Sequence, residues 1–141
     1  MAYQALEKPQ TQYQHNTNLR DIAVLELLFA TGLRVSELCS ITPQSIDLKN
    51  GFVKVQGKGA KERIVFISNI DALSALRTYK NTYCKIISDT DWFFINRLGN
   101  RLNEQSVRIM IDVYANRAKI PEHITPHMIR HSFATLMQKR M

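Results

Sequence analysis

Hydrophobic residues run almost without interruption from Leu19 to Ala30, among residue types that favour helices. Gly32 follows this run, and glycine suits the left-handed conformation that often ends a helix. The pattern therefore predicts a buried helix over 19–30. We expect a second, short helix over the sequence VSELCS at 35–40, because Pro43 prevents its continuation.

Between residues 45 and 68 the hydrophobic pattern changes to alternation, which is typical of strands with one buried face. Two alternating stretches flank Asn50-Gly51, a dipeptide that favours a hairpin turn. A glycine-bearing loop, GKGAK at 57–61, leads into a third apolar stretch at 63–67. The region therefore predicts a three-stranded antiparallel sheet in which neighbours in sequence are neighbours in space.

Helical periodicity returns in the second half of the chain. Ser68 and Asp71 stand three apart, as in a capping box, and predict a helix that runs to about Cys84. An extended piece and a Gly99-Asn100 turn are expected next, after which Asn103 is placed to cap a further amphipathic helix. The fold class predicted from the whole pattern is α+β, mainly helical, with a small antiparallel sheet.

The last predicted helix begins at Thr125 as its cap, with Pro126 in the first helical position, where the missing N–H has no cost. Its spacing predicts one apolar stripe and, beside it, a polar face that carries two histidines and an arginine. The stripe consists of Ile129, Phe133, Leu136 and Met137, and the polar face of His127, Arg130 and His131.

Composition narrows the possible partners and compartments. Among 141 residues there are 19 Lys and Arg against 12 Asp and Glu, and the net charge of +7 favours a polyanionic partner such as nucleic acid. No apolar run is long enough to cross a membrane, and the first 17 residues form a polar segment without the features of a signal sequence. Cys39 and Cys84 have no metal-binding spacing, so a reducing, cytoplasmic location is expected.

Four side chains are candidates for chemistry, namely Arg34, Lys58, His127 and Arg130. Each has a simpler alternative: Arg34 could pair with Glu37 on the surface, Lys58 could be an ordinary loop lysine, and the last two could lie on a solvated helix face. Taken together, two guanidinium groups, a lysine and a histidine without paired carboxylates indicate a pocket for a phosphodiester. Such a pocket would stabilise the transition state of phosphoryl transfer without a metal ion.

A metal site on the last helix is the competing interpretation. His127 and His131 stand four residues apart and could both bind one ion, but a catalytic zinc needs a third ligand. Only Glu122 or His123 is near in sequence, and there is no HExxH motif. We therefore expect neither a metal nor another cofactor.

Three motifs in this order carry a family resemblance: ATGLRVSEL at 30–38, VKVQGKGAKERIVFI at 53–67 and TPHMIRHSFATLM at 125–137. They resemble the catalytic domain of the tyrosine recombinases, the phage integrases and Xer-like site-specific recombinases. The resemblance extends from about Asn18 to Met141 and implies the DNA breaking-rejoining fold of that domain.

The resemblance also implies roles for individual residues. Arg34 matches the first catalytic arginine of the family, and His127 and Arg130 match the histidine and second arginine of its HxxR motif. Lys58 matches the hairpin lysine that donates a proton to the leaving 5′ oxygen. Glu37 matches the acid that supports the first arginine.

Other residues receive supporting or structural interpretations. His131 follows the HxxR motif, as in many relatives, and is expected to be structural. Leu33, Val35 and Leu38 are expected to belong to the core. Four further basic residues are candidate contacts to DNA phosphates, namely Lys61, Arg63, Arg101 and Arg108.

The resemblance also points to absent parts. The attacking tyrosine of the family follows the HxxR motif, whereas the five tyrosines here all precede it. We therefore expect a polar segment at 1–17 and a partial catalytic domain at 18–141, without the N-terminal core-binding domain and the C-terminal tyrosine segment. Such a chain would bind the phosphate but would be inactive alone.

The predicted function is site-specific DNA recombination or integration by metal-free strand breakage and rejoining, of which this chain provides an incomplete catalytic domain. The first alternative is a non-catalytic DNA-binding remnant of an integrase. A metal-dependent nuclease built on His127 and His131 is a further alternative. Expected partners are double-stranded DNA and other recombinase subunits, and the apolar stripe of the last helix is expected to promote self-association.

Overall fold

The computed structural model describes residues 12–57, 59 and 61–117. Its helices are α1 (Gln12–Thr31), α2 (Val35–Cys39), α3 (Ile70–Ser88) and α4 (Glu104–Arg117), and its strands are β1 (Ile46–Asp47), β2 (Phe52–Gln56) and β3 (Glu62–Phe66). The predicted α+β class, mainly helical with a small sheet, is confirmed.

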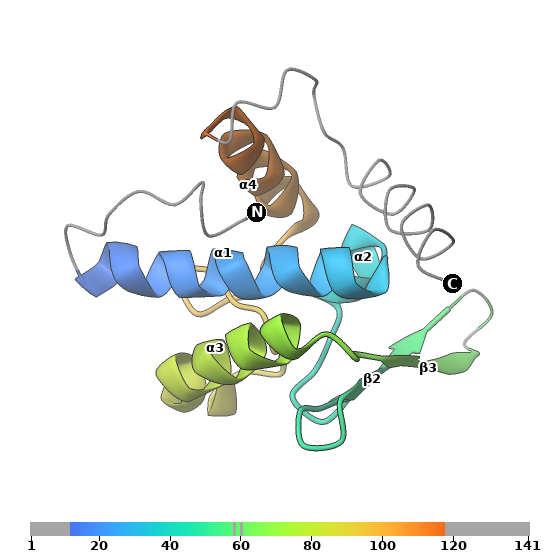
Figure 1. Cartoon of the computed structure of the whole chain (residues 1–141). Helices are drawn as coiled ribbons and strands as arrows, with labels where there is room; N and C mark the ends of the chain where they lie inside the picture. Colours follow the sequence, from blue (N-terminus) through green and yellow to red (C-terminus); the bar gives the residue numbers. More distant parts are fainter. Residues whose placement is uncertain (1–11, 58, 60, 118–141) are drawn as a thin grey trace.

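The long helix α1 lies at the centre of the described structure. It contacts α3 on one side and α4 on the other, and the sheet extends away from the end of α1 that leads into α2 (Figure 1). The residues between these elements are apolar and nearly inaccessible to solvent, and the largest fully buried ones include Leu27, Leu28, Leu33, Leu38, Leu76, Tyr79, Phe93 and Phe94. Their burial is the main stabilising contribution to the fold.

The sheet has the strand order β1-β2-β3 with antiparallel neighbours, which confirms the predicted topology. Val53 and Val55 of β2 are buried, as their alternation predicted, whereas the opposite face of the hairpin is largely exposed. Gly51 turns the chain with φ +76°, and a Cβ there would lie 3.1 Å from the Ile67 carbonyl oxygen. The Asn50-Gly51 turn therefore needs glycine for both conformation and space.

Three predicted helix boundaries are wrong. Helix α1 begins at Gln12, upstream of the predicted start at Leu19. Helix α3 is capped by Asn69, whose side chain accepts a hydrogen bond from the Ala72 N–H at 3.0 Å, and not by Ser68. It also continues to Ser88, past the predicted end near Cys84, and Ile87 in its last turn is buried.

The segment between α3 and α4 is held against the core by Tyr79. The Tyr79 hydroxyl donates to the Phe93 carbonyl at 2.7 Å and accepts from the Ile95 N–H at 3.1 Å. Beyond this point Ile95 forms an isolated antiparallel bridge with Arg101, so the predicted turn at Gly99 is confirmed. The predicted Asn103 cap is also confirmed, since its side chain accepts from the Ser106 N–H at 2.7 Å.

The predicted helix from Thr125 lies outside the described residues. In the part of the chain that is described, every helix is too short or too polar to cross a membrane.

Candidate functional site

Arg34 lies in the sharp turn between α1 and α2. Gly32 takes the left-handed conformation at φ +69°, and its N–H donates to the Leu28 carbonyl at 2.9 Å, which ends α1. Arg34 is then extended, with φ −71° and ψ 149°, immediately before α2. Both chain neighbours, Leu33 and Val35, are buried, whereas Arg34 is exposed. The core therefore fixes the backbone here and leaves Arg34 at the surface.

Glu37 connects this turn to the hairpin. Its Oε1 accepts a hydrogen bond from the Arg34 backbone N–H at 2.9 Å. Its carboxylate also accepts two hydrogen bonds from the Arg63 guanidinium, Nη1 to Oε2 at 2.6 Å and Nη2 to Oε1 at 3.2 Å. The bonds to Glu37 raise the pKa of Arg63, so this guanidinium stays charged. Glu37 was expected to support Arg34, and these contacts reach the backbone of Arg34 and the side chain of Arg63.

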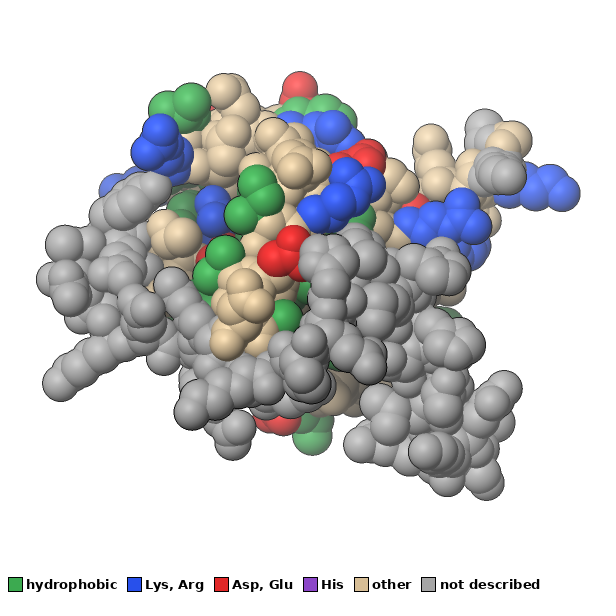
Figure 2. All heavy atoms as spheres, turned by 90° about the horizontal axis from the view of Figure 1, so that it is seen from above, with side chains coloured by type: hydrophobic (Ala, Val, Ile, Leu, Met, Phe, Trp, Pro, Cys, Tyr) green, Lys and Arg blue, Asp and Glu red, His purple; other side chains and the backbone are tan. Residues whose placement is uncertain are grey.

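The β2–β3 hairpin carries the loop in which Lys58 was predicted to act. The Gly57 N–H donates to the Lys61 carbonyl at 2.8 Å, and Gly59 has φ +76°. Lys58 itself lies outside the described residues, and Lys61 is exposed. Lys and Arg side chains gather on the projecting end of the molecule where this hairpin lies (Figure 2).

Two other predicted phosphate contacts have partners within the protein. The Arg101 Nε donates to the Cys39 carbonyl at 3.0 Å, its Nη2 donates to the Ser40 hydroxyl at 3.2 Å, and its guanidinium lies 5.3 Å from the ring centre of Trp92. Arg101 therefore binds the end of α2. Arg108 pairs at 3.3 Å with the acid one turn earlier in α4, and both of these side chains are well exposed.

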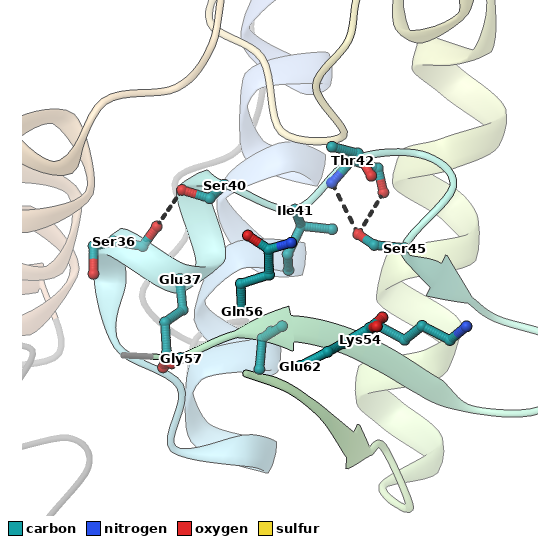
Figure 3. Close-up of a pocket in the computed structure, with 11 residues that line it drawn as sticks. Ser36, Glu37, Ser40, Ile41, Thr42, Ser45, Lys54, Gln56, Gly57 and Glu62 are labelled. Carbon is teal, nitrogen blue, oxygen red and sulfur yellow. Dashed lines mark hydrogen bonds between the residues drawn. The ribbon is translucent and has the colours of Figure 1, made fainter. Parts of the chain in front are cut away.

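A hollow of about 610 Å³ lies beside this region, between α2 with its following loop and the edge of β2 (Figure 3). Its lining contains several hydroxyl groups, one lysine and two carboxylates, so it has no marked preference for one sign of charge. The lining residues are Ser36, Glu37, Ser40, Ile41, Thr42, Ser45, Lys54, Val55, Gln56, Gly57 and Glu62. Sequence reasoning missed this hollow because its hydroxyl residues have no distinctive spacing.

Cys39 is the last residue of α2, the helix that follows Arg34, and its side chain is buried. Burial raises the pKa of its thiol to about 11, so the thiol is protonated near neutral pH. Within residues 12–57, 59 and 61–117, no group of three His, Cys, Asp or Glu side chains is arranged to hold a metal ion.

The remaining predicted site residues, His127, Arg130 and His131, lie outside the described residues, as Lys58 does. The structure thus brings Arg34 and Glu37 together and adds Arg63 to them.

Comparison with known proteins identifies the family. The sequence model of the Phage integrase family matches residues 3–141. The chain belongs to this family. It is 45% identical over 133 residues to a tyrosine recombinase of Agathobacter rectalis, and this alignment covers 94% of this chain and 44% of that protein. It is 40% identical over 121 residues to the tyrosine recombinase XerC of Thermodesulfovibrio yellowstonii, with 82% of this chain and 40% of that protein covered.

Solved structures of recombinases share the fold. The crystal structure of XerA recombinase has a TM-score of 0.81 at 29% identity and covers 88% of this chain and 45% of that one. The XerH site-specific recombinase, solved with its difH substrate before cleavage, also has a TM-score of 0.81, at 23% identity, over 99% of this chain and 40% of that one. This phage integrase chain therefore spans less than half the length of these relatives, and it is similar to part of their fold.

Proposed function

We propose that this chain acts in site-specific DNA recombination or integration, as the phosphate-binding part of a tyrosine recombinase catalytic domain. The observation that carries the proposal is Arg34, held at the surface between two buried residues with its backbone bonded to Glu37, in a chain of the phage integrase family. We assign the partial catalytic domain to residues 18–141. Helix α1 already begins at Gln12, so its first turns extend into the segment before that domain.

The proposed chemistry is transfer of one DNA phosphate without a metal. Arg34 and Arg130 hold the nonbridging oxygens and stabilise the charge that develops on them. His127 supports the same phosphate by hydrogen bonding. A tyrosine hydroxyl loses its proton to water as its oxygen forms a bond to phosphorus. The bond from phosphorus to the 5′ oxygen breaks, and Lys58 donates its proton to that oxygen.

The attacking hydroxyl is not assigned to any of the tyrosines present here. Tyr79 is fully buried and its hydroxyl binds the backbone of Phe93 and Ile95. The Tyr114 hydroxyl donates to the Asp21 carboxylate at 2.9 Å, also inside the structure. All five tyrosines precede His127 in the sequence, so we infer that the nucleophile comes from outside these 141 residues.

The proposed partners are duplex DNA and other recombinase subunits. A net charge of +7 and the exposed Lys54 and Lys61 of the hairpin suit a polyanion. The XerH relative was solved with a DNA substrate, which supports the same class of partner. We further propose a cytoplasmic location. We also propose self-association through the apolar stripe of the last predicted helix, and light scattering over a range of chain concentrations would test this self-association.

Strand cleavage by a chimera tests the function. In the recombinase of Agathobacter rectalis, the segment that matches over 133 residues is replaced by this chain, so that the relative supplies the rest of the enzyme. The substrate is a nicked duplex carrying the relative's recombination site, from which a covalent protein–DNA adduct accumulates. The relative itself is the positive control.

We expect the chimera to form the adduct with EDTA present. A chimera that binds the duplex with the affinity of the relative and forms no adduct would overturn the proposal in favour of a non-catalytic DNA-binding chain. An adduct that depends on a divalent metal ion would overturn the metal-free chemistry.

A further inference from the structure

The ion pair between Glu37 and Arg63 joins two segments that are 26 residues apart in sequence. Glu37 belongs to α2 and Arg63 to β3, and the pair has two hydrogen bonds between one carboxylate and one guanidinium. Two parallel hydrogen bonds fix the orientation of the guanidinium relative to the carboxylate as well as their distance, because the guanidinium is planar and rigid. The Glu37 side chain is only 11% exposed, against 46% for Arg63, so the carboxylate lies beneath the guanidinium.

The same carboxylate holds the turn that carries Arg34. Glu37 Oε1 accepts both the Arg34 backbone N–H and the Arg63 Nη2. One side chain thus connects the first proposed phosphate-binding arginine to the hairpin. Figure 3 shows the Glu37 side chain extending from α2 toward Gly57 at the end of β2.

Arg63 also lies beside the loop that contains Lys58. A Cβ placed on Gly57 would lie 3.7 Å from Arg63 Nη1, so the guanidinium lies close to the residue that directly precedes Lys58. Arg63 pairs with Val55 across the two strands, and the Gly57 N–H binds the Lys61 carbonyl at 2.8 Å. The guanidinium therefore lies near the point where the regular pairing of the hairpin ends.

We propose that Arg63 is a positioning residue, which holds the base of the Lys58 loop against the Arg34 turn through Glu37. The inference rests on the proposed function, because it takes Lys58 as the proton donor and Arg34 as a phosphate-binding group. It replaces the interpretation of Arg63 as a DNA phosphate contact, since both of its terminal nitrogens donate to Glu37.

The first test uses the 141-residue chain itself and needs no activity. Hydrogen exchange is measured for the hairpin amides of residues 54–66 in the unaltered chain, in Arg63→Gln and in Arg63→Lys. Arg97→Gln is the matched control, because Arg97 is also exposed and its replacement removes the same charge. We expect Arg63→Gln to increase hairpin exchange about tenfold or more, Arg63→Lys to restore part of the protection, and exchange in α3 to stay unchanged.

The second test measures the position of the proton donor. In the chimera described above, Arg63→Gln should slow cleavage by roughly 10²-fold, the loss that a small misplacement of a reacting group can cause. The substrate is then changed to one with sulfur in place of the leaving 5′ oxygen. A thiol ionises near pH ~8.5 and leaves without a proton donor, so the defects of Arg63→Gln and Lys58→Ala should both largely disappear.

Other results would overturn the inference. Unchanged hairpin exchange in Arg63→Gln would show that the pair does not hold the loop. A cleavage defect that persists with the sulfur substrate would show that Arg63 does not act through Lys58. If Arg63→Gln binds DNA more weakly and with a lower salt dependence, and Arg97→Gln does not, then Arg63 contacts a DNA phosphate. If the unaltered chimera does not cleave, the proposed function fails, and hydrogen exchange still decides whether Arg63 holds the hairpin.

Discussion

Replacement of Arg101 by alanine should destabilise the chain and leave its DNA binding unchanged. The substitution removes the hydrogen bond to the Cys39 carbonyl at 3.0 Å, the bond to Ser40 and the contact with Trp92 at 5.3 Å. A bond from a charged donor contributes about 1.5–3 kcal/mol, and an exposed cation–π contact contributes about 0.5–1 kcal/mol. Because Arg101 is partly exposed, we expect the free energy of unfolding to fall by ~2 kcal/mol.

Urea denaturation followed by circular dichroism measures this loss, and a thermal scan should show a melting temperature lower by roughly 6 °C for a chain of this size. Arg97→Ala is the matched control, because Arg97 is exposed and its loss should change stability by less than ~0.5 kcal/mol. The reasoning is refuted if Arg101→Ala unfolds like the control. It is also refuted if Arg101→Ala weakens DNA binding and reduces the salt dependence by the ~0.9 in log–log slope that one phosphate contact contributes.

Three further predictions concern the core. Tyr79→Phe removes the hydroxyl that binds the Phe93 carbonyl and the Ile95 N–H, and should lower the free energy of unfolding by ~2 kcal/mol; an unchanged urea midpoint would contradict this. At about pH 8, maleimide should label exposed Cys84 and should not label buried Cys39 until denaturant is added. Mass spectrometry of the peptides measures which cysteine is labelled. Rapid labelling of Cys39 in the native chain would count against the structure. The pKa of Cys39 is raised from 9.0 to about 11, so folding favours the protonated thiol. Its contribution to stability is complete below pH 9.0 and is lost as the pH rises toward about 11, and a Cys39→Ala variant should lack this part of the pH profile.

Local sequence signals predicted much of the fold. Gly32 ends α1 in the left-handed conformation, and the Asn50-Gly51 turn connects the first two strands. These predictions succeeded because glycine conformation and strand alternation depend on near neighbours. The cap of α3 was assigned to Ser68 and not to Asn69 because both residue types can cap a helix and only packing selects between them.

The site was less predictable than the fold, because its contacts join distant parts of the chain. The sequence placed Arg34 just after the helix end at Gly32, and the structure agrees. The partner of Glu37 could not be derived from spacing, since Arg63 lies 26 residues away and meets it only after the hairpin folds back. Arg101 was predicted to contact a DNA phosphate because it is positively charged. Its contacts with Cys39 and Trp92 could not be predicted from local sequence, because they also depend on tertiary structure.

The central claim is that Arg34 stabilises a phosphoryl transition state on DNA. The measurement that tests it most directly compares the rate of covalent adduct formation with duplex affinity, for the chimera carrying Arg34→Lys and for the unaltered chimera at one salt concentration. We predict a rate loss of ~10³-fold or more with an affinity loss below about tenfold, as expected for an arginine that acts mainly in the transition state. Equal losses of rate and affinity, or an unchanged rate, would contradict the account.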